Sequence, residues 1–414
     1  MCDSRGRATL FAWSGRTPVG RFGRDCGGRY SFEYEPGASQ PVSLSLPLSG
    51  GWRGSAPRNF LEGLLPEDGA VRERMARSLG ADGVEPIDLL PLLDVAGGLT
   101  FTAGDEPPSP DGGEAEAMTE DDVASEFRGI HASCRSWPSG DPRRRFSLAG
   151  AQGKLAVRVR EDGAWLWPSA AAASTHVVKP DGRALRDVAA VESATLDLAR
   201  LVGLEVPDHV VVRRGGVEGL LEARFDRARP AAGQVARVHA EDLAQALGIG
   251  GGAKYDVLLT DVASLFARSG LGAELTHAFL EQVIFNTHVG NNDAHAKNYS
   301  LVHGPGGTRM SPLYDAISMG HWPELRNSVL GIEVNGKVDG WEVTLGDWCE
   351  AGRSCGLDGE RVAEDARRIV GALVGLRPGD IDAPEPIAAD ICDQIRAYTR
   401  DIRADVVGAR AHPA

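Results

Sequence analysis

One polar stretch between two apolar elements carries the residue types best suited to chemistry. Asn291–Ser300 reads NNDAHAKNYS and follows the apolar, helix-like run Leu280–Val289. Asp293 and Asn298 are five residues apart, the interval between the base and the metal-binding asparagine of a protein-kinase catalytic loop. Asp315, seventeen residues after Asn298, could supply a second metal ligand. The pattern favours phosphoryl transfer from a nucleotide held by magnesium.

Small residues before a predicted strand form a candidate phosphate-covering loop. The segment Phe146–Lys154 reads FSLAGAQGK and precedes the strand-like Leu155–Arg160. Its small residues are Ala149, Gly150, Ala151 and Gly153. Such residues let backbone N–H groups approach an anion closely. The spacing differs from that of a G-x-x-x-x-G-K-[ST] loop, and a hairpin turn without a ligand is the alternative.

A lysine at the end of an apolar strand is a second candidate for phosphate binding. Lys179 ends Ser174–Lys179 and is followed by Pro180, so its ammonium could project into a cleft. Glu192, near the start of a predicted helix, could pair with it as a helix glutamate does in protein kinases. The simpler alternatives are an exposed edge-strand lysine and an exposed helix glutamate.

Hydrophobic periodicity predicts the elements that position these residues. The sequence predicts strands at Ala8–Trp13, Thr17–Phe22, Arg29–Glu35, Val42–Leu46, Leu155–Arg160, Ser174–Lys179, Val206–Val212, Leu220–Phe225 and Tyr299–Val302. Period-two alternation supports Arg29–Glu35 and Val42–Leu46, and Val206–Val212 is β-branched. Helical spacing predicts helices at Asn59–Leu65, Val71–Leu79, Val188–Val202, Glu241–Leu247, Val257–Phe266, Leu275–Val289, Gly340–Cys349, Arg361–Leu376 and Pro386–Val407. The first part of the chain is thus rich in strands, and the second half is mostly helical.

A change of composition divides the chain. Residues 103–122 are rich in proline, glycine and carboxylates, which is typical of a linker or an exposed loop. We therefore predict an accessory subdomain at 1–104, an acidic linker at 105–125, a nucleotide-binding lobe at 126–238 and a helical catalytic lobe at 239–414.

Composition also limits the class of protein. The 414 residues are 42% hydrophobic, enough for two or three packed units. The net charge of -14 argues against a broad basic surface, so any contact with DNA would go through a partner. Six cysteines lack a C-x-x-C pair, and the chain contains neither an apolar leader segment nor an apolar run of about 18 residues. We expect a cytoplasmic protein with reduced thiols that does not span a membrane.

Taken in order, the motifs FSLAGAQGK, THVVK, ARFDR, EDLAQALG, DAHAKN and YD resemble the HipA family of bacterial toxin serine/threonine kinases. The resemblance covers nearly the whole chain, including SLSLPL and FLEGLLPE in the first seventy residues. It implies an α+β, two-lobed protein-kinase-like fold with an N-terminal β-rich accessory subdomain and a mainly α-helical C-terminal lobe.

The resemblance also implies roles for single residues. Asp293 would be the catalytic aspartate, Asn298 and Asp315 would hold Mg²⁺, and Ser147 matches the family's autophosphorylated serine. The residues expected to bind ATP are Ala149, Gly150, Ala151, Gln152, Gly153, Lys154, Lys179, Ala223, Arg224, Phe225, His295, Lys297 and Tyr314.

Three positions depart from the family pattern. Gly153 stands where a Glu is common, Ala223 replaces the Glu of a V-E-R-F-D-R segment, and Ala294 replaces a Gly. The segment Ala223–Phe225 is the expected crossing between the lobes, where backbone groups would bind adenine. The change at Ala223 therefore bears on adenine affinity more than on activity.

Several functions remain open at this point. The first is a protein serine/threonine kinase acting on a protein target, with aminoacyl-tRNA synthetases among the targets that the resemblance implies. The second is a co-repressor that binds a HipB-like antitoxin and reaches DNA only through it. The third is a small-molecule or lipid kinase with the same catalytic parts. A metal hydrolase built from His288, Asp293, His295 and His303 is the fourth.

Overall fold

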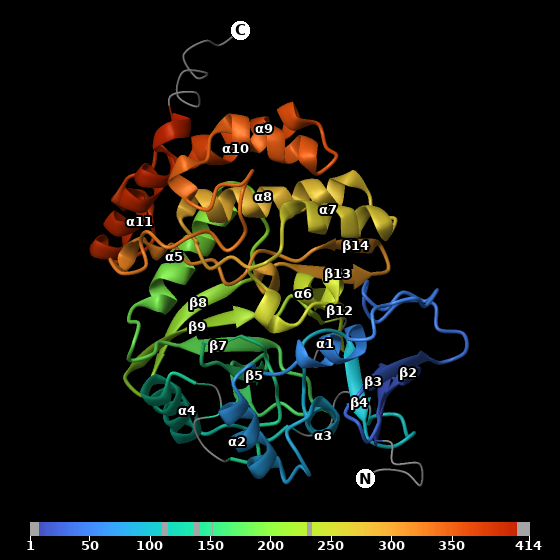
Figure 1. The fold of residues 1–414 in the computed structure, drawn as a ribbon. Helices are drawn as coiled ribbons and strands as arrows, with labels where there is room; N and C mark the ends of the chain where they lie inside the picture. The colour runs from blue at the N-terminus through green and yellow to red at the C-terminus, as the bar shows by residue number, and fades with distance from the viewer. Residues whose placement is uncertain are drawn as a thin grey trace. The chain divides into compact units, whose positions relative to one another are not determined.

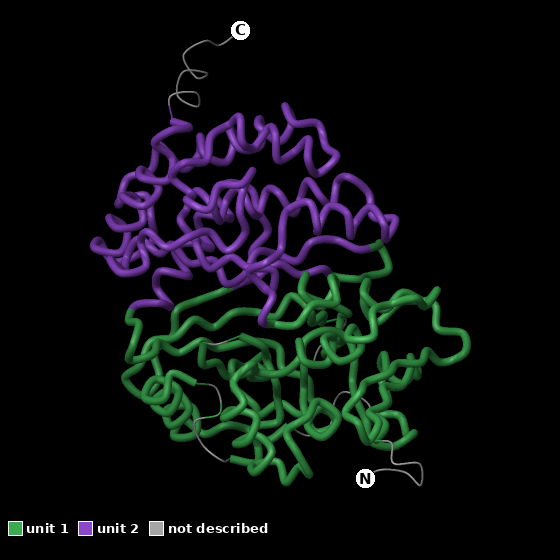
Figure 2. Tube along the Cα trace, viewed as in Figure 1, with its two compact units in different colours: residues 1–186, 209–251, 302–307 green, residues 187–208, 252–301, 308–414 purple. Residues whose placement is uncertain are grey.

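A computed structural model describes residues 8–109, 115–135, 137, 141–150, 152–229 and 234–403. The chain divides into two units, coloured separately in Figure 2. Unit 1 comprises Met1–Arg186, His209–Gly251 and Val302–Gly307, and unit 2 comprises Asp187–Asp208, Gly252–Leu301 and Thr308–Ala414. Each unit therefore combines segments that are far apart in the sequence.

An antiparallel four-stranded sheet begins unit 1 (Figure 1). Its strands are β1 (Ala8–Ser14), β2 (Thr17–Arg24), β3 (Tyr30–Tyr34) and β4 (Leu99–Thr102), in the order β3-β2-β1-β4. Alternation places Tyr30 and Phe32 in the core beside Phe22. Three helices contribute to the same core: α1 (Ala56–Glu62), α2 (Gly69–Leu79) and α3 (Pro86–Leu89). The three strands predicted at the start of the chain are confirmed.

The predicted strand at Val42–Leu46 is wrong, because the segment forms a turn. The N–H of Leu46 donates to the carbonyl of Ser43 at 3.0 Å. The Ser43 hydroxyl and the Leu44 N–H donate to the Glu241 carboxylate at 2.5 and 3.0 Å. The apolar alternation does bury Val42 and Leu46. However, the buried Glu241 carboxylate accepts hydrogen bonds from this segment, including one from a backbone N–H that would pair with a neighbouring strand if the segment were a strand.

A five-stranded antiparallel sheet forms the second half of unit 1. Its strands are β5 (Leu155–Val159), β6 (Trp165–Leu166), β7 (His176–Pro180), β8 (His209–Arg214) and β9 (Val217–Ala223), in the order β6-β5-β7-β9-β8. The helix α4 (Glu120–Ser133) buries Val123, Phe127 and Ile130 in the same core. Short elements complete the unit: β10 (Arg227–Ala228), β11 (Ala236–Arg237), β12 (His239–Asp242) and α6 (Leu243–Leu247).

The segment predicted as a linker ends in regular structure. The N–H of Met118 donates to the carbonyl of Trp165 at 2.8 Å. The helix α4 begins at Glu120, inside the predicted linker, because Thr119 and Asp122 form a capping box. Three of the carboxylates in this segment, Glu120, Asp121 and Asp122, thus lie in the first turn of a helix, where the helix dipole favours negative charge.

Unit 2 is mainly helical. Its helices are α5 (Val188–Leu201), α7 (Leu259–Arg268), α8 (Ala273–Val289), α9 (Leu345–Ser354), α10 (Gly359–Leu373) and α11 (Glu385–Tyr398). Figure 1 shows α8 between α7, α10 and α11, and it packs against all three. Its side chains are buried around most of its circumference, as expected for a central helix. The hairpin β13 (Ser300–Gly304) and β14 (Gly307–Met310) follows the polar stretch after α8 and belongs to a three-stranded sheet in the order β12-β13-β14. Its residues Val302–Gly307 are part of unit 1.

One predicted helix of unit 2 starts later than expected. The residues from Gly340 to Glu342 form a short 3-10 turn, and α9 begins at Leu345. Thr344 caps this helix with Asp347, which explains the boundary.

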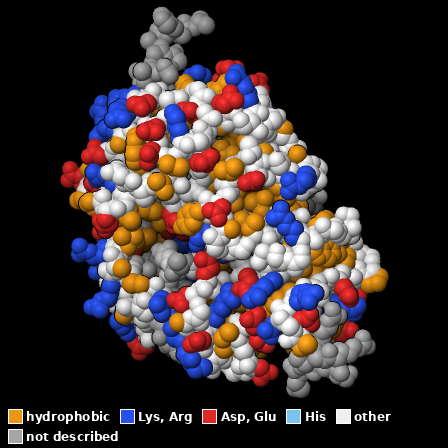
Figure 3. Space-filling model, viewed as in Figure 1, with side chains coloured by type: hydrophobic (Ala, Val, Ile, Leu, Met, Phe, Trp, Pro, Cys, Tyr) orange, Lys and Arg blue, Asp and Glu red, His pale blue; other side chains and the backbone are white. Residues whose placement is uncertain are grey.

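Charged side chains of both signs are interspersed on the face shown in Figure 3. Among the described residues, no helix is both long enough and apolar enough to cross a membrane.

Candidate active site

The polar stretch after α8 is anchored by side chains of its own unit. The helix ends at Gly290, whose left-handed backbone (φ +72°) turns the chain. Asn291 Nδ2 then donates to Asn286 Oδ1 at 3.0 Å and to the carbonyl of Asp315 at 3.3 Å. These bonds connect the loop both to α8 and to the segment that carries the second predicted metal ligand.

Asn298 and Asp315 lie side by side. Asn298 Nδ2 donates to Asp315 Oδ2 at 2.7 Å, while its Oδ1 accepts from the N–H of His295 at 3.2 Å. Asp315 has a φ of +57°, which few residues other than glycine adopt and which concentrates at functional sites. Amide and carboxylate oxygens are hard donors of the kind that Mg²⁺ prefers. The pair therefore fits the predicted metal.

Asp293 is exposed and bound by a tyrosine that the sequence analysis missed. The Tyr255 hydroxyl donates to Asp293 Oδ1 at 2.5 Å. The Tyr255 ring meets the His295 ring edge-to-face, with centroids 4.9 Å apart. In addition, the N–H of Ala296 donates to the carbonyl of Lys254 at 3.1 Å. The only sequence signal for this contact was a tyrosine after a glycine-rich run, GIGGGAKYD.

The other predicted residues of unit 2 lie on the same two segments as the metal pair. His295 is buried, and its Nδ1 lacks a hydrogen-bond partner in the described part of the chain. Burial lowers the pKa of His295, although the neighbouring Asp293 carboxylate acts in the opposite direction. Tyr314 donates from its hydroxyl to the carbonyl of Lys297 at 2.8 Å and also contacts Ser300 Oγ at 2.7 Å. A buried ring nitrogen without a hydrogen-bond partner, such as His295 Nδ1, is rare, and a polar group of a ligand would supply that partner.

The candidate phosphate loop lies in unit 1, directly before β5. Lys154 Nζ donates to the carbonyl of Ala149 at 2.9 Å and so closes the loop on itself. Gly150 has a φ of +101°, and a Cβ there would lie 2.8 Å from Lys154 Nζ. Gln152 is half-buried, whereas Ala151 lies outside the described residues. The conformation at Gly150 thus requires glycine.

Packing explains two of the departures from the family pattern. A Cβ on Gly153 would lie 2.6 Å from Ile130 Cγ2 and 2.9 Å from the carbonyl carbon of Arg135, so a glutamate does not fit there. Ala294 is buried against Gly331, where a Cβ would lie 2.6 Å from the Ala294 carbonyl carbon. Gly331, rather than a glycine at position 294, therefore lets the two backbone segments approach each other closely.

Lys179 lies on a central strand rather than an edge strand. β7 has β5 on one side and β9 on the other, and Lys179 is only 4% exposed. Its Nζ lies 3.6 Å from Glu222 Oε2 on β9. Glu192, the predicted partner, is fully buried on α5 in unit 2. The alternatives of an exposed lysine and an exposed glutamate are therefore both wrong.

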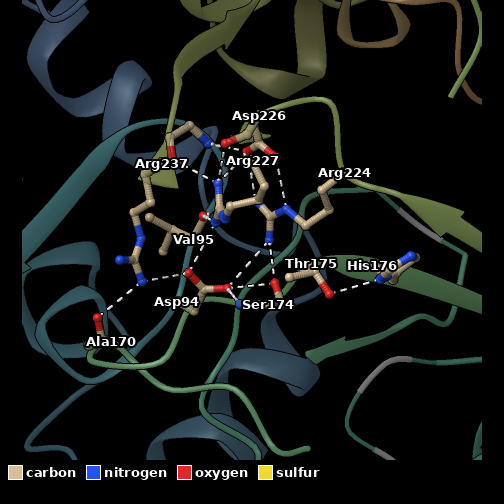
Figure 4. Close-up of polar contacts among 11 residues, drawn as sticks. Asp94, Val95, Ala170, Ser174, Thr175, His176, Arg224, Asp226, Arg227 and Arg237 are labelled. Carbon is tan, nitrogen blue, oxygen red and sulfur yellow. Dashed lines mark hydrogen bonds and ion pairs between the residues drawn. The ribbon is translucent and has the colours of Figure 1, made fainter. Parts of the chain in front are cut away.

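The segment predicted as the crossing begins at the last residue of β9, but the chain does not pass between the units there, because His209–Gly251 all belong to unit 1. Ala223 is paired with His176 of β7, and the N–H of Arg224 donates to the carbonyl of Thr175 at 2.9 Å. The Arg224 side chain enters a buried ionic cluster, where it donates to Asp226 at 2.9 and 2.6 Å (Figure 4). Because this guanidinium and the N–H of Arg224 are both bound to protein groups, Arg224 would contact a nucleotide only through its carbonyl. Phe225 follows it and is half-buried.

Ser147 is fully buried. Its hydroxyl donates to the carbonyl of Leu64 at 2.7 Å, and its N–H donates to the carbonyl of Asp94 at 2.8 Å. In this conformation the hydroxyl cannot receive a phosphoryl group. Phosphorylation of Ser147 would require this segment to move.

The metal-hydrolase alternative has no site in the described residues. His288 is fully buried, its Nδ1 lies 3.0 Å from the carbonyl of Tyr398, and its Nε2 accepts from Trp348 Nε1 at 2.9 Å. Both ring nitrogens are thus used within the core. No group of three or more His, Cys, Asp or Glu side chains in the described ranges could hold a metal ion.

Two protein-family models match the chain. Residues 10–102 match the HipA N-terminal domain, and residues 146–375 match the HipA-like C-terminal domain, which alone covers more than half of the chain. This chain belongs to the HipA family. The loop before β5, the predicted crossing after β9 and the stretch after α8 all lie within the matched HipA-like C-terminal domain.

Individual relatives agree with this family. The Sinorhizobium fredii protein Y4mE is 33% identical over 352 residues, which cover 80% of this chain and 83% of that protein. The Shewanella oneidensis serine/threonine-protein kinase toxin HipA is 29% identical over 300 residues, which cover 67% of each protein. Both proteins carry the word kinase in their names.

A solved structure of the same family confirms the fold. The Shewanella oneidensis toxin–antitoxin complex of HipA, HipB and its operator DNA matches with a TM-score of 0.78 and 22% identity. The match covers 98% of this chain and 100% of that chain. The predicted α+β, kinase-like fold of the HipA family is therefore confirmed.

Proposed function

We propose that this chain is an ATP-dependent protein serine/threonine kinase, a HipA-family toxin that phosphorylates a protein target and its own Ser147. The observation that carries the proposal is the 2.7 Å contact between Asn298 and Asp315, on segments that also present Asp293. Asp315 has a left-handed backbone (φ +57°), a conformation that is often found at functional sites.

Asp293 is the proposed base. Its exposed carboxylate accepts the proton of the substrate hydroxyl while the hydroxyl oxygen forms a bond to the γ-phosphorus of ATP. The bond between the γ-phosphorus and the bridging oxygen breaks, and ADP leaves with that electron pair. A carboxylate has two acceptor oxygens, so the Tyr255 hydroxyl on Oδ1 is compatible with a substrate on Oδ2.

Asn298 and Asp315 would hold Mg²⁺. Bound there, the ion would offset negative charge on the phosphates. Both residues are restrained, since Asn298 accepts from the N–H of His295 and the carbonyl of Asp315 accepts from Asn291. Because these side chains are already ordered, less conformational entropy is lost when a metal binds.

Unit 1 carries the cations proposed for the ATP phosphates. Lys179 is nearly buried beside Glu222, and its charge would act through a low local dielectric. Lys154 lies in the loop with Gly150 and would exchange its bond to Ala149 for a phosphate oxygen. The backbone of the predicted crossing would bind adenine, and the buried His295 Nδ1 would take a further polar group of the nucleotide.

Phosphorylation of Ser147 is proposed to be self-inhibitory. A phosphate adds about -1.5 to -2 charge beside a loop meant for ATP phosphates. The modified side chain cannot return to its buried position against the Leu64 carbonyl, because a charged group there would lack compensation. The segment that leads into the phosphate loop would then stay displaced.

The proposed partner is a HipB-like antitoxin. The structural relative is a complex of HipA with HipB and operator DNA. A net charge of -14 disfavours direct contact with a polyanion, so contact with DNA would be indirect. The proposed compartment is the cytoplasm. The proposed substrate is a protein, and the resemblance to the HipA family implies aminoacyl-tRNA synthetases among the candidate targets.

A labelled-ATP assay on cell extract, followed by identification of the labelled protein, tests the proposal. Asp293→Ala should abolish transfer while nucleotide binding persists, and Asp382→Ala, at an exposed aspartate of the same unit, should behave as wild type. Transfer by Asp293→Ala would exclude the assigned role. If Asp293→Ala and wild type were equally toxic in cells, the co-repressor function would be favoured. If only small molecules became labelled, the third alternative would be favoured.

A further inference from the structure

A buried ionic cluster in unit 1 centres on Asp94 (Figure 4). Asp94 lies between the short helix η1 (Leu90–Leu92) and β4, in the region that matches the HipA N-terminal domain. Its side chain is fully buried. A buried carboxylate is stable only when charged and hydrogen-bonded partners compensate it.

Five polar groups from the other family domain supply that compensation. Asp94 Oδ2 accepts from Ser174 Oγ at 2.6 Å, from Ser174 N at 3.0 Å and from Arg224 Nη1 at 3.5 Å. Asp94 Oδ1 accepts from Arg227 Nη2 and Arg237 Nη2, both at 3.0 Å. Burial would raise the pKa of Asp94, but the three arginines outweigh burial and lower it.

A second carboxylate completes the cluster. Asp226 binds the Arg224 guanidinium and also accepts from the N–H of Gly97 at 2.6 Å. The carbonyl of Val95 accepts from Arg224 at 3.1 Å and from Arg227 at 2.7 Å. The segment after η1 thus binds the turn after β9 through a side chain, an N–H and a carbonyl.

The backbone of Asp94 binds another part of the proposed ATP site. Its N–H donates to the carbonyl of Arg145, and its carbonyl accepts from the N–H of Ser147, both at 2.8 Å. The strand bridge between Asp94 and Phe146 is parallel. One residue of the N-terminal domain therefore holds both the entry to the phosphate loop and the predicted crossing.

We propose that Asp94 is a positioning residue for ATP, acting through Arg224 and Arg227 on the backbone of Ala223–Phe225. Without its charge, the Arg224 and Arg227 guanidiniums would share the single carboxylate of Asp226. Repulsion among the neighbouring arginines would then loosen the turn. The N-terminal domain then contributes directly to nucleotide affinity. This inference rests on the proposed function, because it assumes that the predicted crossing binds adenine.

The test compares three full-length variants with wild type by thermal unfolding, binding of a fluorescent ATP analogue, and the KM for ATP and kcat of phosphoryl transfer. Asp94→Asn keeps the shape and removes the charge. Ser174→Ala removes one hydroxyl that contacts both Asp94 and Arg224. Glu241→Gln is the matched control.

Glu241 suits the control because it is also a buried carboxylate that joins the two family domains. It is 2% exposed, and in the described part of the chain it is bound by Ser43, Leu44 and His303. Glu241→Gln tests whether weakening any contact with the N-terminal domain raises the KM for ATP in the same way.

For Asp94→Asn we expect the KM for ATP to rise about tenfold, with kcat within about twofold of wild type. Ser174→Ala should raise the KM about threefold, and it decides the test should Asp94→Asn not fold. An unchanged KM in a folded variant, a loss of kcat alone, or an equal rise in Glu241→Gln would overturn the inference. If wild type itself neither binds ATP nor transfers phosphate, the proposed function has failed and this inference falls with it.

Discussion

The Tyr255 hydroxyl and the Asp293 carboxylate are joined by a hydrogen bond of 2.5 Å across 38 residues of sequence. Tyr255 is 51% exposed, so burial alone does not account for its position. It is held by the ring contact with His295 and by the neighbouring bond between Ala296 N and the carbonyl of Lys254. An ordered tyrosine on an exposed carboxylate restricts the orientations that the carboxylate can adopt.

Replacing this tyrosine should therefore slow catalysis. Tyr255→Phe keeps the ring and removes the hydroxyl, so Asp293 gains rotational freedom and kcat should fall about tenfold, with the KM for ATP unchanged. Steady-state kinetics and nucleotide titration measure both quantities. Tyr30→Phe, which removes a Tyr–Glu85 hydrogen bond in unit 1, is the control and should leave kcat unchanged. A fully active Tyr255→Phe would remove any role for the hydroxyl.

Asp315 variants should separate the charge of this residue from its backbone conformation. Asp315→Asn retains a residue type that tolerates a left-handed backbone, so stability should persist while kcat falls at least about a hundredfold and more Mg²⁺ is required. Asp315→Ala should lose activity and also about 1 kcal/mol of stability. Magnesium titrations of activity and thermal unfolding distinguish the two effects. Wild-type Mg²⁺ dependence in Asp315→Asn would refute its role as a ligand.

Buried His288 should make the protein less stable in mild acid. Burial lowers the pKa of His288 from its ordinary value near 6.5 to about 4. Between these values the unfolded chain binds the proton and the folded protein does not, so stability present above pH 6.5 is lost as pH falls toward 4. The expected loss from pH 7 to pH 5 is about 2 kcal/mol.

Urea unfolding of wild type and His288→Gln at pH 7 and pH 5 measures this effect. The variant should start less stable, because it disturbs the bonds to Trp348 and Tyr398, but its stability should depend less on pH. Equal pH dependence in both proteins would show that another group is responsible.

The close packing at Gly153 predicts that even a methyl group is harmful there. Gly153→Ala would place a Cβ 2.6 Å from Ile130 Cγ2 and close to the backbone of Arg135, so it should destabilise the protein by about 1–3 kcal/mol. Thermal or urea unfolding measures the change. Gly104→Ala, where a Cβ meets nothing within 4 Å, is the control. If Gly153→Ala left the stability unchanged, α4 would have to shift away from this contact at little energetic cost.

The sequence by itself was informative wherever neighbouring residues decide the structure. The apolar run of α8, its end at Gly290 and the polar stretch behind it could be predicted, because a helix and its cap depend on residues within a few positions of each other. The interval between Asp293 and Asn298 likewise pointed to a catalytic loop before any contact was known.

Only the tertiary structure could assign the contacts between distant segments. Periodicity predicted a strand at Val42–Leu46, but Glu241, nearly two hundred residues later, converts it into a turn. Asp94 gave no signal in the sequence, although it binds Arg237, 143 residues further along. Hydrophobic spacing indicates which face of an element is buried, whereas the partner of a buried charge depends on which surfaces meet after folding.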